Sequence, residues 1–121
     1  MASKTRHAAQ WRGLRAAGVP IICTWIDEAG GAPRDGWPPV LVRCIREAAA
    51  ARALVLYAEP DEVLKDALVE AGAALAAGVP VFTVGVDRSF SFLHHPLVHG
   101  CESLDDALIQ ARVLASECGD R

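Results

Sequence analysis

The sequence has few of the features that mark secreted, membrane-spanning or nucleic-acid-binding proteins. Its four cysteines form no C-x-x-C pair, which excludes the usual zinc-knuckle and dithiol redox patterns. No segment reads as a signal peptide or as a long apolar span. The formal net charge is −3, so the chain lacks the positive field that attracts a nucleic-acid backbone. We therefore expect a cytoplasmic protein with mostly buried, inert thiols and with neither a membrane nor a nucleic acid as partner.

The composition is that of a packed domain. Of the 121 residues, 52% are hydrophobic and 22% are charged, whereas a disordered chain has too few apolar residues to offset the entropy of ordering. This length suits one core but leaves too little material for a second. No linker or low-complexity tract divides the sequence. We expect a single α/β domain over residues 1–121.

Apolar runs of strand length alternate with helical patterns along the chain, which is typical of parallel βαβ units. Strands are predicted over 19–25, 52–59 and 79–85, with a short last strand at 97–101. Helices are predicted over 4–17, 40–51 and 61–77, and from a cap at Ser103 onward. Loops are predicted over 26–39 and 86–96. The pattern favours a three-layer, flavodoxin-like open parallel sheet of about four to five strands.

One predicted element is out of place, because the chain opens on the helix over 4–17. A doubly wound sheet usually opens on a strand that becomes its central member. A gap at that position would leave backbone hydrogen bonds of the neighbouring strands unpaired. Either the first strand lies before Met1, or the sheet is assembled without it. We favour the first explanation.

Glu70 is the candidate reactive group. In the predicted helix it falls at the edge of an apolar face, beside Val63 and Ala74. The nearby Gly72 would let a ligand or a second helix approach closely, and partial burial would raise the pKa of the carboxyl group. The alternative is an ordinary solvated glutamate, since most glutamates are surface residues.

Other candidate residues follow predicted strands, at the end where ligands bind in open α/β sheets. Glu59 and Asp61 follow the second strand, and Asp61 is either a second catalytic carboxylate or the N-cap of the next helix. Trp25 and Asp27 end the first strand. Asp27 would accept hydrogen bonds from hydroxyl groups, while Trp25 either stacks on a ligand or only fills the core.

The start of the first helix and a histidine-rich run complete the candidate set. Ser3, Lys4 and His7 lie where the helix dipole favours an anion such as a phosphate, although chain-terminal residues are often frayed and solvated instead. The spacing in HHPLVH (94–99) suits no zinc pattern. We therefore expect no metal or other cofactor, and we interpret this run as part of a loop over the site or of a subunit contact.

Several stretches together resemble the nucleoside 2-deoxyribosyltransferase-like family. They are ASKTRHAAQWRGLRAAG, IICTWIDE, LVLYAEPDE, LKDALVEAGAALAAGVPVFTVG and SLDDAL, and they cover nearly the whole chain. The most specific is ALVEAGAALAAGVPV, which resembles the family's glutamate-centred segment. The family's first strand ends at the position of A-S-K (2–4), so the resemblance also implies a strand before Met1.

The resemblance implies cleavage of the N-glycosidic bond of deoxynucleosides or nucleotides, or transfer of the sugar to another base. Glu70 would be the nucleophile, and Asp61, or else Glu59, would be the acidic residue near the base. Asp66 stands where many relatives carry glycine or a small residue, so its charge would lie near the sugar or its phosphate. The asparagine of the family's last loop has no counterpart in SFLHHPLVHGC.

Three functions are open at this point. The first is an enzyme, a hydrolase or transferase that uses Glu70 and needs no cofactor. The second is a module that binds a nucleotide or a nucleotide-derived signal without converting it. The third is a purely structural subunit. The expected partners are a small nucleoside or nucleotide and further copies of the chain, in a homodimer or a higher homo-oligomer.

Overall fold

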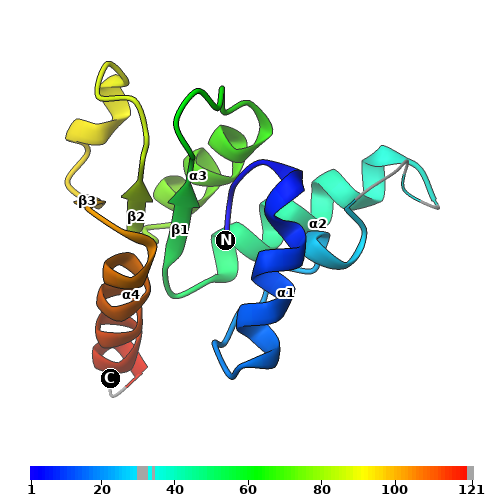
Figure 1. Cartoon of the computed structure of the whole chain (residues 1–121), viewed down its shortest axis with the longest axis horizontal. Coiled ribbons are helices and arrows are strands. Elements are labelled where there is room, and N and C mark those ends of the chain that lie inside the picture. Colours follow the sequence, from blue (N-terminus) through cyan, green and yellow to red (C-terminus); the bar gives the residue numbers. More distant parts are fainter. Residues whose placement is uncertain (30–32, 34, 120–121) are drawn as a thin grey trace.

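The computed structural model describes residues 1–29, 33 and 35–119, the last five of them by their backbone alone (Figure 1). Its helices are α1 (Ala8–Ala16), α2 (Trp37–Ala50), α3 (Asp66–Ala76) and α4 (Leu104–Gly119). Its strands are β1 (Leu54–Tyr57), β2 (Val81–Val84) and β3 (Val98–Cys101). Short 3₁₀ turns span Thr5–His7, Trp25–Asp27 and Ser91–His94.

The strands form an open parallel sheet in the order β1-β2-β3. Leu54 of β1 lies opposite Val81 of β2, which lies opposite Val98 of β3. Apolar, often β-branched residues fill β1 and β2, as expected for strands that are covered on both faces. The predicted α/β class with an open parallel sheet is confirmed, although the described residues form three strands and not the four to five expected.

Two helices cover opposite faces of the sheet (Figure 1). Alternate residues of a strand point to opposite faces. Leu54 and Leu56 accordingly share one core cluster with α3, and Val55 shares another with α4. The buried residues of α3 are the small Ala67, Ala71 and Ala74, whereas Ala107 and Ala111 are buried on α4. These small side chains let both helices lie close to the sheet.

A third cluster joins α1 to the turn at Trp25–Asp27. Trp11 of α1 is fully buried, and its indole N–H donates to the Ser3 hydroxyl at 2.9 Å. Trp25 and Ile26 are buried in the same cluster. Among the described elements, α2 makes its main contact with α3. The two consecutive helices α2 and α3 thus pack against each other on the same side of the sheet as the cluster of Leu54 and Leu56.

The strand predicted over residues 19–25 is wrong. Residues 19–24 take no regular structure, and the 3₁₀ turn begins at Trp25. On the free edge of β1, Ala2 is the one described residue that pairs with the strand, in a single parallel bridge to Leu56. A strand needs a neighbour for its hydrogen bonds, and the described residues place none beside 19–24. The amide and hydroxyl of Thr24 donate instead to the carboxylate of Glu47.

Two helix boundaries also differ from the prediction. α2 begins at Trp37, with prolines in its first turn. The N–H groups of this turn have no partner within the helix, so the missing N–H of proline costs no hydrogen bond there. α3 begins at Asp66 and not at Asp61. Asp61 has a left-handed φ of 68°, in a turn where the Glu62 amide donates to the Glu59 carbonyl. The prediction of Asp61 as an N-cap is therefore wrong. Ser103 does cap α4, because its hydroxyl accepts from the Asp106 amide.

The described cysteines are free thiols. Cys23 is buried, while Cys44 and Cys101 are half-buried, and the side chain of Cys118 lies outside the described residues. Burial raises the pKa of Cys44 to about 11 and also raises that of Cys23. These groups are therefore mostly protonated and poorly nucleophilic near neutral pH. Within the same part of the chain, no helix is long and apolar enough to cross a bilayer.

We expect Gly85→Ala to destabilise the fold. Gly85 has a φ of +73°, and a Cβ atom there would lie 2.0 Å from the Ala58 carbonyl oxygen. We expect a loss of about 2 kcal/mol or more in the free energy of unfolding, measured by urea denaturation. Gly72→Ala is the matched control, because Gly72 lies in α3 with open space around it. This control should gain about 0.5–1 kcal/mol. Equal effects of the two changes would contradict the role of Gly85.

Candidate functional site

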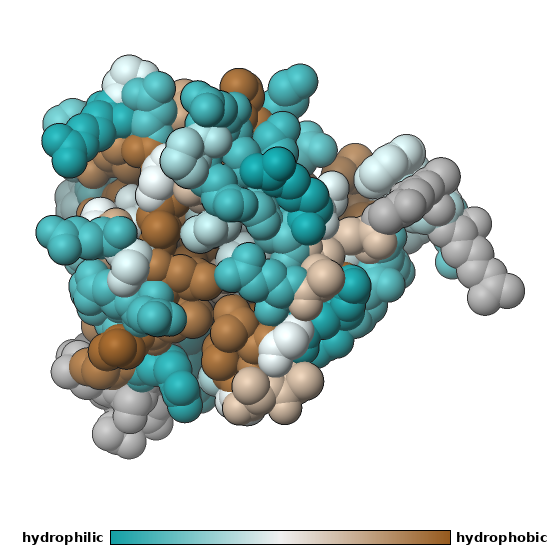
Figure 2. Space-filling view, viewed as in Figure 1, coloured by the Kyte–Doolittle hydropathy of each residue, from teal (hydrophilic) through white to brown (hydrophobic). Residues whose placement is uncertain are grey.

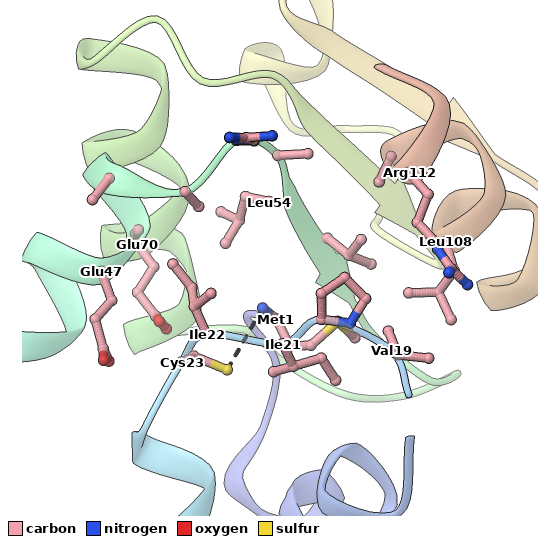
Figure 3. Close-up of a pocket in the computed structure, with 18 residues that line it drawn as sticks. Met1, Val19, Ile21, Ile22, Cys23, Glu47, Leu54, Glu70, Leu108 and Arg112 are labelled. Carbon is pink, nitrogen blue, oxygen red and sulfur yellow. Dashed lines mark hydrogen bonds between the residues drawn. The ribbon is translucent and has the colours of Figure 1, made fainter. Parts of the chain in front are cut away.

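Two cavities are candidates for a ligand. The first has a volume of about 470 Å³ and lies beside β1, between residues 19–23 and helices α2, α3 and α4 (Figure 3). The second has about 440 Å³ and lies at the carboxyl ends of β1 and β2. Both volumes are in the range of small-molecule sites. The second cavity lies where ligands of open α/β sheets usually bind.

Glu70 lies in the first cavity. Its side chain extends from α3 toward Ile22 and Cys23, and the residue is half-buried (Figure 3). Burial, together with the nearby charges of Glu47 and Asp66, raises the pKa of its carboxyl group to about 7. The amino terminus of Met1 opposes this shift. Glu70 is therefore close to half-ionised at neutral pH, as suits a group that takes part in acid–base or nucleophilic chemistry.

A second carboxylate of this cavity was not predicted. Glu47 of α2 lines the same space, and Figure 3 shows it beside Glu70. Its carboxylate accepts hydrogen bonds of 3.0 Å from the amide and from the hydroxyl of Thr24. A glutamate in a helical run carries no local signal of such a role, because the packing of α2 on α3 creates it.

The carboxylates predicted to assist Glu70 lie elsewhere. Asp61 and Glu59 line the second cavity, and Asp61 is exposed. Since α3 begins at Asp66, residues 61–65 form a loop before the helix, and Asp61 does not lie on the same helix as Glu70. The predicted pair of Glu70 and Asp61 is therefore not brought together. Asp66 is exposed in the first turn of α3, and its charge acts on Glu70.

The predicted binding residues near the amino terminus have structural contacts. Ser3 is buried and accepts from Trp11, and the indole N–H of Trp25 donates to the Met1 carbonyl at 3.1 Å. Trp25 thus fills the core, the alternative that the sequence left open. Asp27 is exposed and paired with Arg15 at 2.6 Å, and this hydrogen bond lowers the pKa of Asp27.

His7 belongs to an ionic cluster that borders the second cavity. Its Nε2 lies 2.9 Å from a carboxylate oxygen of Glu62, whose side chain is only 5% exposed. Burial would raise the pKa of Glu62, but the hydrogen bonds from the Glu59 amide and His7, with the charges of His7 and Arg6, lower it overall. Lys4 is half-buried beside this cluster in the chain, and neither it nor His7 lines either of the two cavities described above.

The ligand atoms of His7, Glu59 and Glu62 lie within 4.8 Å of one another, close enough to hold a metal ion. Arg6, however, places its Nε 2.6 Å from a Glu62 oxygen. A guanidinium at that distance already satisfies this carboxylate and repels a cation. We therefore interpret the cluster as an ion pair network that fixes the amino-terminal segment to the loop after β1. The sequence contained these residues but gave no sign of their pairing.

The histidine-rich run has other contacts. The His95 ring accepts from the Leu97 amide, and His99 stacks on Phe82 at 5.0 Å between ring centroids. Phe90 lines the second cavity and lies 5.8 Å from Phe92. The loop over 86–96 thus borders the second cavity and not the cavity that holds Glu70.

We expect Glu70→Gln to stabilise the protein increasingly as the pH rises. The folded-state pKa of Glu70, about 7, exceeds its ordinary value of 4.5, so ionisation between these values disfavours the folded state. The variant should equal the natural protein near pH 4 and exceed it by up to about 3 kcal/mol at pH 8. Urea denaturation across this range measures the difference. Glu102→Gln, at an exposed turn, is the control. A difference that stays constant with pH would contradict the shift.

Comparisons with protein-family models, with curated proteins and with solved structures found no match to this chain. The functional assignment therefore depends on the residues themselves. Their most informative feature is a half-buried carboxyl group with a raised pKa in a cavity of small-molecule size.

Proposed function

We propose that the protein cleaves the N-glycosidic bond of a nucleoside or nucleotide, or transfers its deoxyribosyl group, with Glu70 as the nucleophile. The observation that carries this proposal is the position of Glu70, half-buried in a cavity of about 470 Å³. Such a volume suits a small ligand that is largely removed from water. The resemblance of ALVEAGAALAAGVPV to a glutamate-centred family segment supports the same residue.

The proposed reaction has two steps. The ionised Glu70 oxygen forms a bond to the anomeric carbon, while the bond from that carbon to the base nitrogen breaks. The electron pair of the broken bond goes to the base, which takes up a proton. In the second step, water or a second base attacks the anomeric carbon, loses a proton and releases the Glu70 carboxylate. The product is a free sugar or a new nucleoside.

The departing base needs a proton donor within reach. Asp61 was the first candidate, but it lines the other cavity. Glu47 shares the cavity of Glu70 and influences its pKa. We therefore propose Glu47, in place of Asp61, as the group that exchanges a proton with the base.

We make further proposals about the whole protein that agree with this function. They are membership of the nucleoside 2-deoxyribosyltransferase-like family and a flavodoxin-like sheet of four to five strands in three layers. We also propose a homodimer or a higher homo-oligomer, and a small nucleoside or nucleotide as partner. The free thiols of Cys23, Cys44 and Cys101 suit the cytoplasm, where reductants keep cysteines unpaired.

We expect purified protein to release free base from deoxynucleosides or deoxynucleotides. Chromatography measures the free base after incubation with and without an acceptor base. Glu70→Ala should lower the rate by at least about 1,000-fold, because the covalent step is lost. Glu70→Gln should have a similar effect while preserving the shape of the side chain. Glu102→Gln should retain full activity. Undiminished release by both Glu70 variants would contradict the proposal.

A second candidate function is binding without conversion. The first cavity is lined mostly by aliphatic residues, and Asp61 lies outside it. A site without a well-placed acid would hold a nucleotide and release it unchanged. Calorimetry that detects binding of a nucleotide, combined with no free base after long incubation, would select this function. Loss of binding in a cavity variant such as Ala48→Trp would locate the ligand.

A further inference from the structure

The first half of α2 extends away from the body of the molecule. Ala48, in the second half, is the one residue of α2 that is buried, and Cys44 and Glu47 beside it are half-buried. Figure 1 shows the first turns of α2 at the end of the molecule that is farthest from β3 and α4, and Figure 2 shows the same end in space-filling form. The second half of the helix therefore holds α2 in place, while the first half is open to solvent.

The exposed part of α2 carries large apolar side chains. Trp37, Leu41 and Ile45 are 57%, 47% and 43% exposed, and Val42 beside them is 55% exposed. Single exposed apolar residues are normal on a protein surface, whereas a contiguous group of them marks a contact with another molecule. None of these four residues lines either cavity, so a ligand of Glu70 would not cover them.

The spacing of these residues fits a second copy of the same helix. Trp37, Leu41 and Ile45 follow one another at intervals of four residues, so they form one row along α2 with Leu41 at its centre. When two copies of α2 lie antiparallel with Leu41 on the two-fold axis, Leu41 meets its own counterpart. Trp37 of each copy then meets Ile45 of the other copy. A row that matches itself in this way suits a two-fold dimer, in which both copies use the same surface.

The charges near the two ends of the row agree with the same arrangement. Asp35 precedes α2, Arg46 follows Ile45, and the side chains of both charged residues are exposed. In the antiparallel pair, Arg46 of one copy lies beside the start of α2 in the other copy, where its guanidinium can pair with the Asp35 carboxylate. A parallel pair in register would instead bring the two Arg46 side chains together. The charges therefore favour the antiparallel pair.

We propose that two copies of the chain form a two-fold dimer through the row of Trp37, Leu41 and Ile45. This surface replaces the histidine-rich run over 94–99 as the contact between subunits. One row of a helix buries less than the roughly 800 Å² per partner of a typical stable interface, so we expect a dissociation constant in the micromolar range. The inference gives the proposed homodimer a specific interface, and it does not depend on the reaction of Glu70.

Disulfide cross-linking tests the register of the two helices. Leu41→Cys places a thiol on the proposed axis, so mild oxidation should convert most of this variant into a covalent dimer. Trp37→Cys is the matched control, because its counterpart lies about 12 Å away along the helix, whereas a disulfide joins Cα atoms less than about 7 Å apart. A mixture of the Trp37→Cys and Ile45→Cys chains should cross-link again. The natural chain and Ile109→Cys, at an exposed position of α4, measure cross-linking by other cysteines and by random collision.

Sedimentation at concentrations up to about 1 mM measures the dimer itself. The natural chain should dimerise, and Leu41→Glu should raise the dissociation constant at least about 100-fold. Ile109→Glu is the matched control and should change little, because it places the same charge at an exposed apolar position of α4. Arg46→Glu should raise the dissociation constant about fivefold or more. Adding Asp35→Arg to Arg46→Glu should restore the dimer, because the pair is then reversed and not broken.

Several outcomes would overturn the proposal. One is a natural chain that stays monomeric at every concentration, which would leave the row to a different partner. Another is a dimer that Ile109→Glu disrupts and Leu41→Glu does not, which would place the interface on α4. A third is equal cross-linking of the Leu41→Cys and Trp37→Cys chains. Base release by the natural chain is measured separately, so failure here leaves the assignment of Glu70 to its own test.

Discussion

The position of β1 is the constraint on which the rest of the structure depends. Its alternate residues serve different neighbours: the backbone of Leu54 bonds toward β2, while that of Val55 and Tyr57 bonds toward Ala2. Its side chains alternate in the same way between the α3 and α4 faces. β1 therefore fixes the sheet, both helical layers and the amino-terminal segment at once. The close approach of Gly85 to the Ala58 carbonyl holds the end of β2 against the residue that follows β1.

The environment of Glu70 follows from this packing. α3 rests on the sheet through Ala67, Ala71 and Ala74, and the helical period then directs Glu70 to one side of that contact, toward α2. Small residues on the contact face bring the helix close, so Glu70 loses much of its hydration, and it has no hydrogen-bond partner among the residues that the structure describes. Its pKa rises for that reason.

Glu62 shows the opposite outcome for a buried carboxylate. Its side chain is only 5% exposed, yet its pKa falls, because His7, Arg6 and the Glu59 amide surround it. The comparison separates two roles for glutamates in this protein. A carboxylate with hydrogen-bond partners holds segments together. A carboxylate without them remains available to react with a ligand. Burial alone does not distinguish the two roles.

The sequence by itself determined the elements whose signals are local. β1, β2, β3 and the cap at Ser103 lie where the patterns predicted them, because apolar runs, turn residues and caps act over a few neighbouring residues. The edge position of Glu70 on α3 follows from the same helical period. The strand predicted over 19–25 failed although its residues suit a strand, because a strand also requires a partner that only the assembled sheet provides.

Tertiary structure decided which charged groups meet. His7 and Glu62 are 55 residues apart in the chain, and Thr24 and Glu47 are 23 apart, so no spacing rule joins them. The same holds for Glu47 and Glu70, which share a cavity because α2 packs on α3. Asp61, closer to Glu70 in sequence, lies in the other cavity because the chain turns before α3 begins. Local patterns set where each carboxylate sits on its own element, and packing between elements set which carboxylates act together.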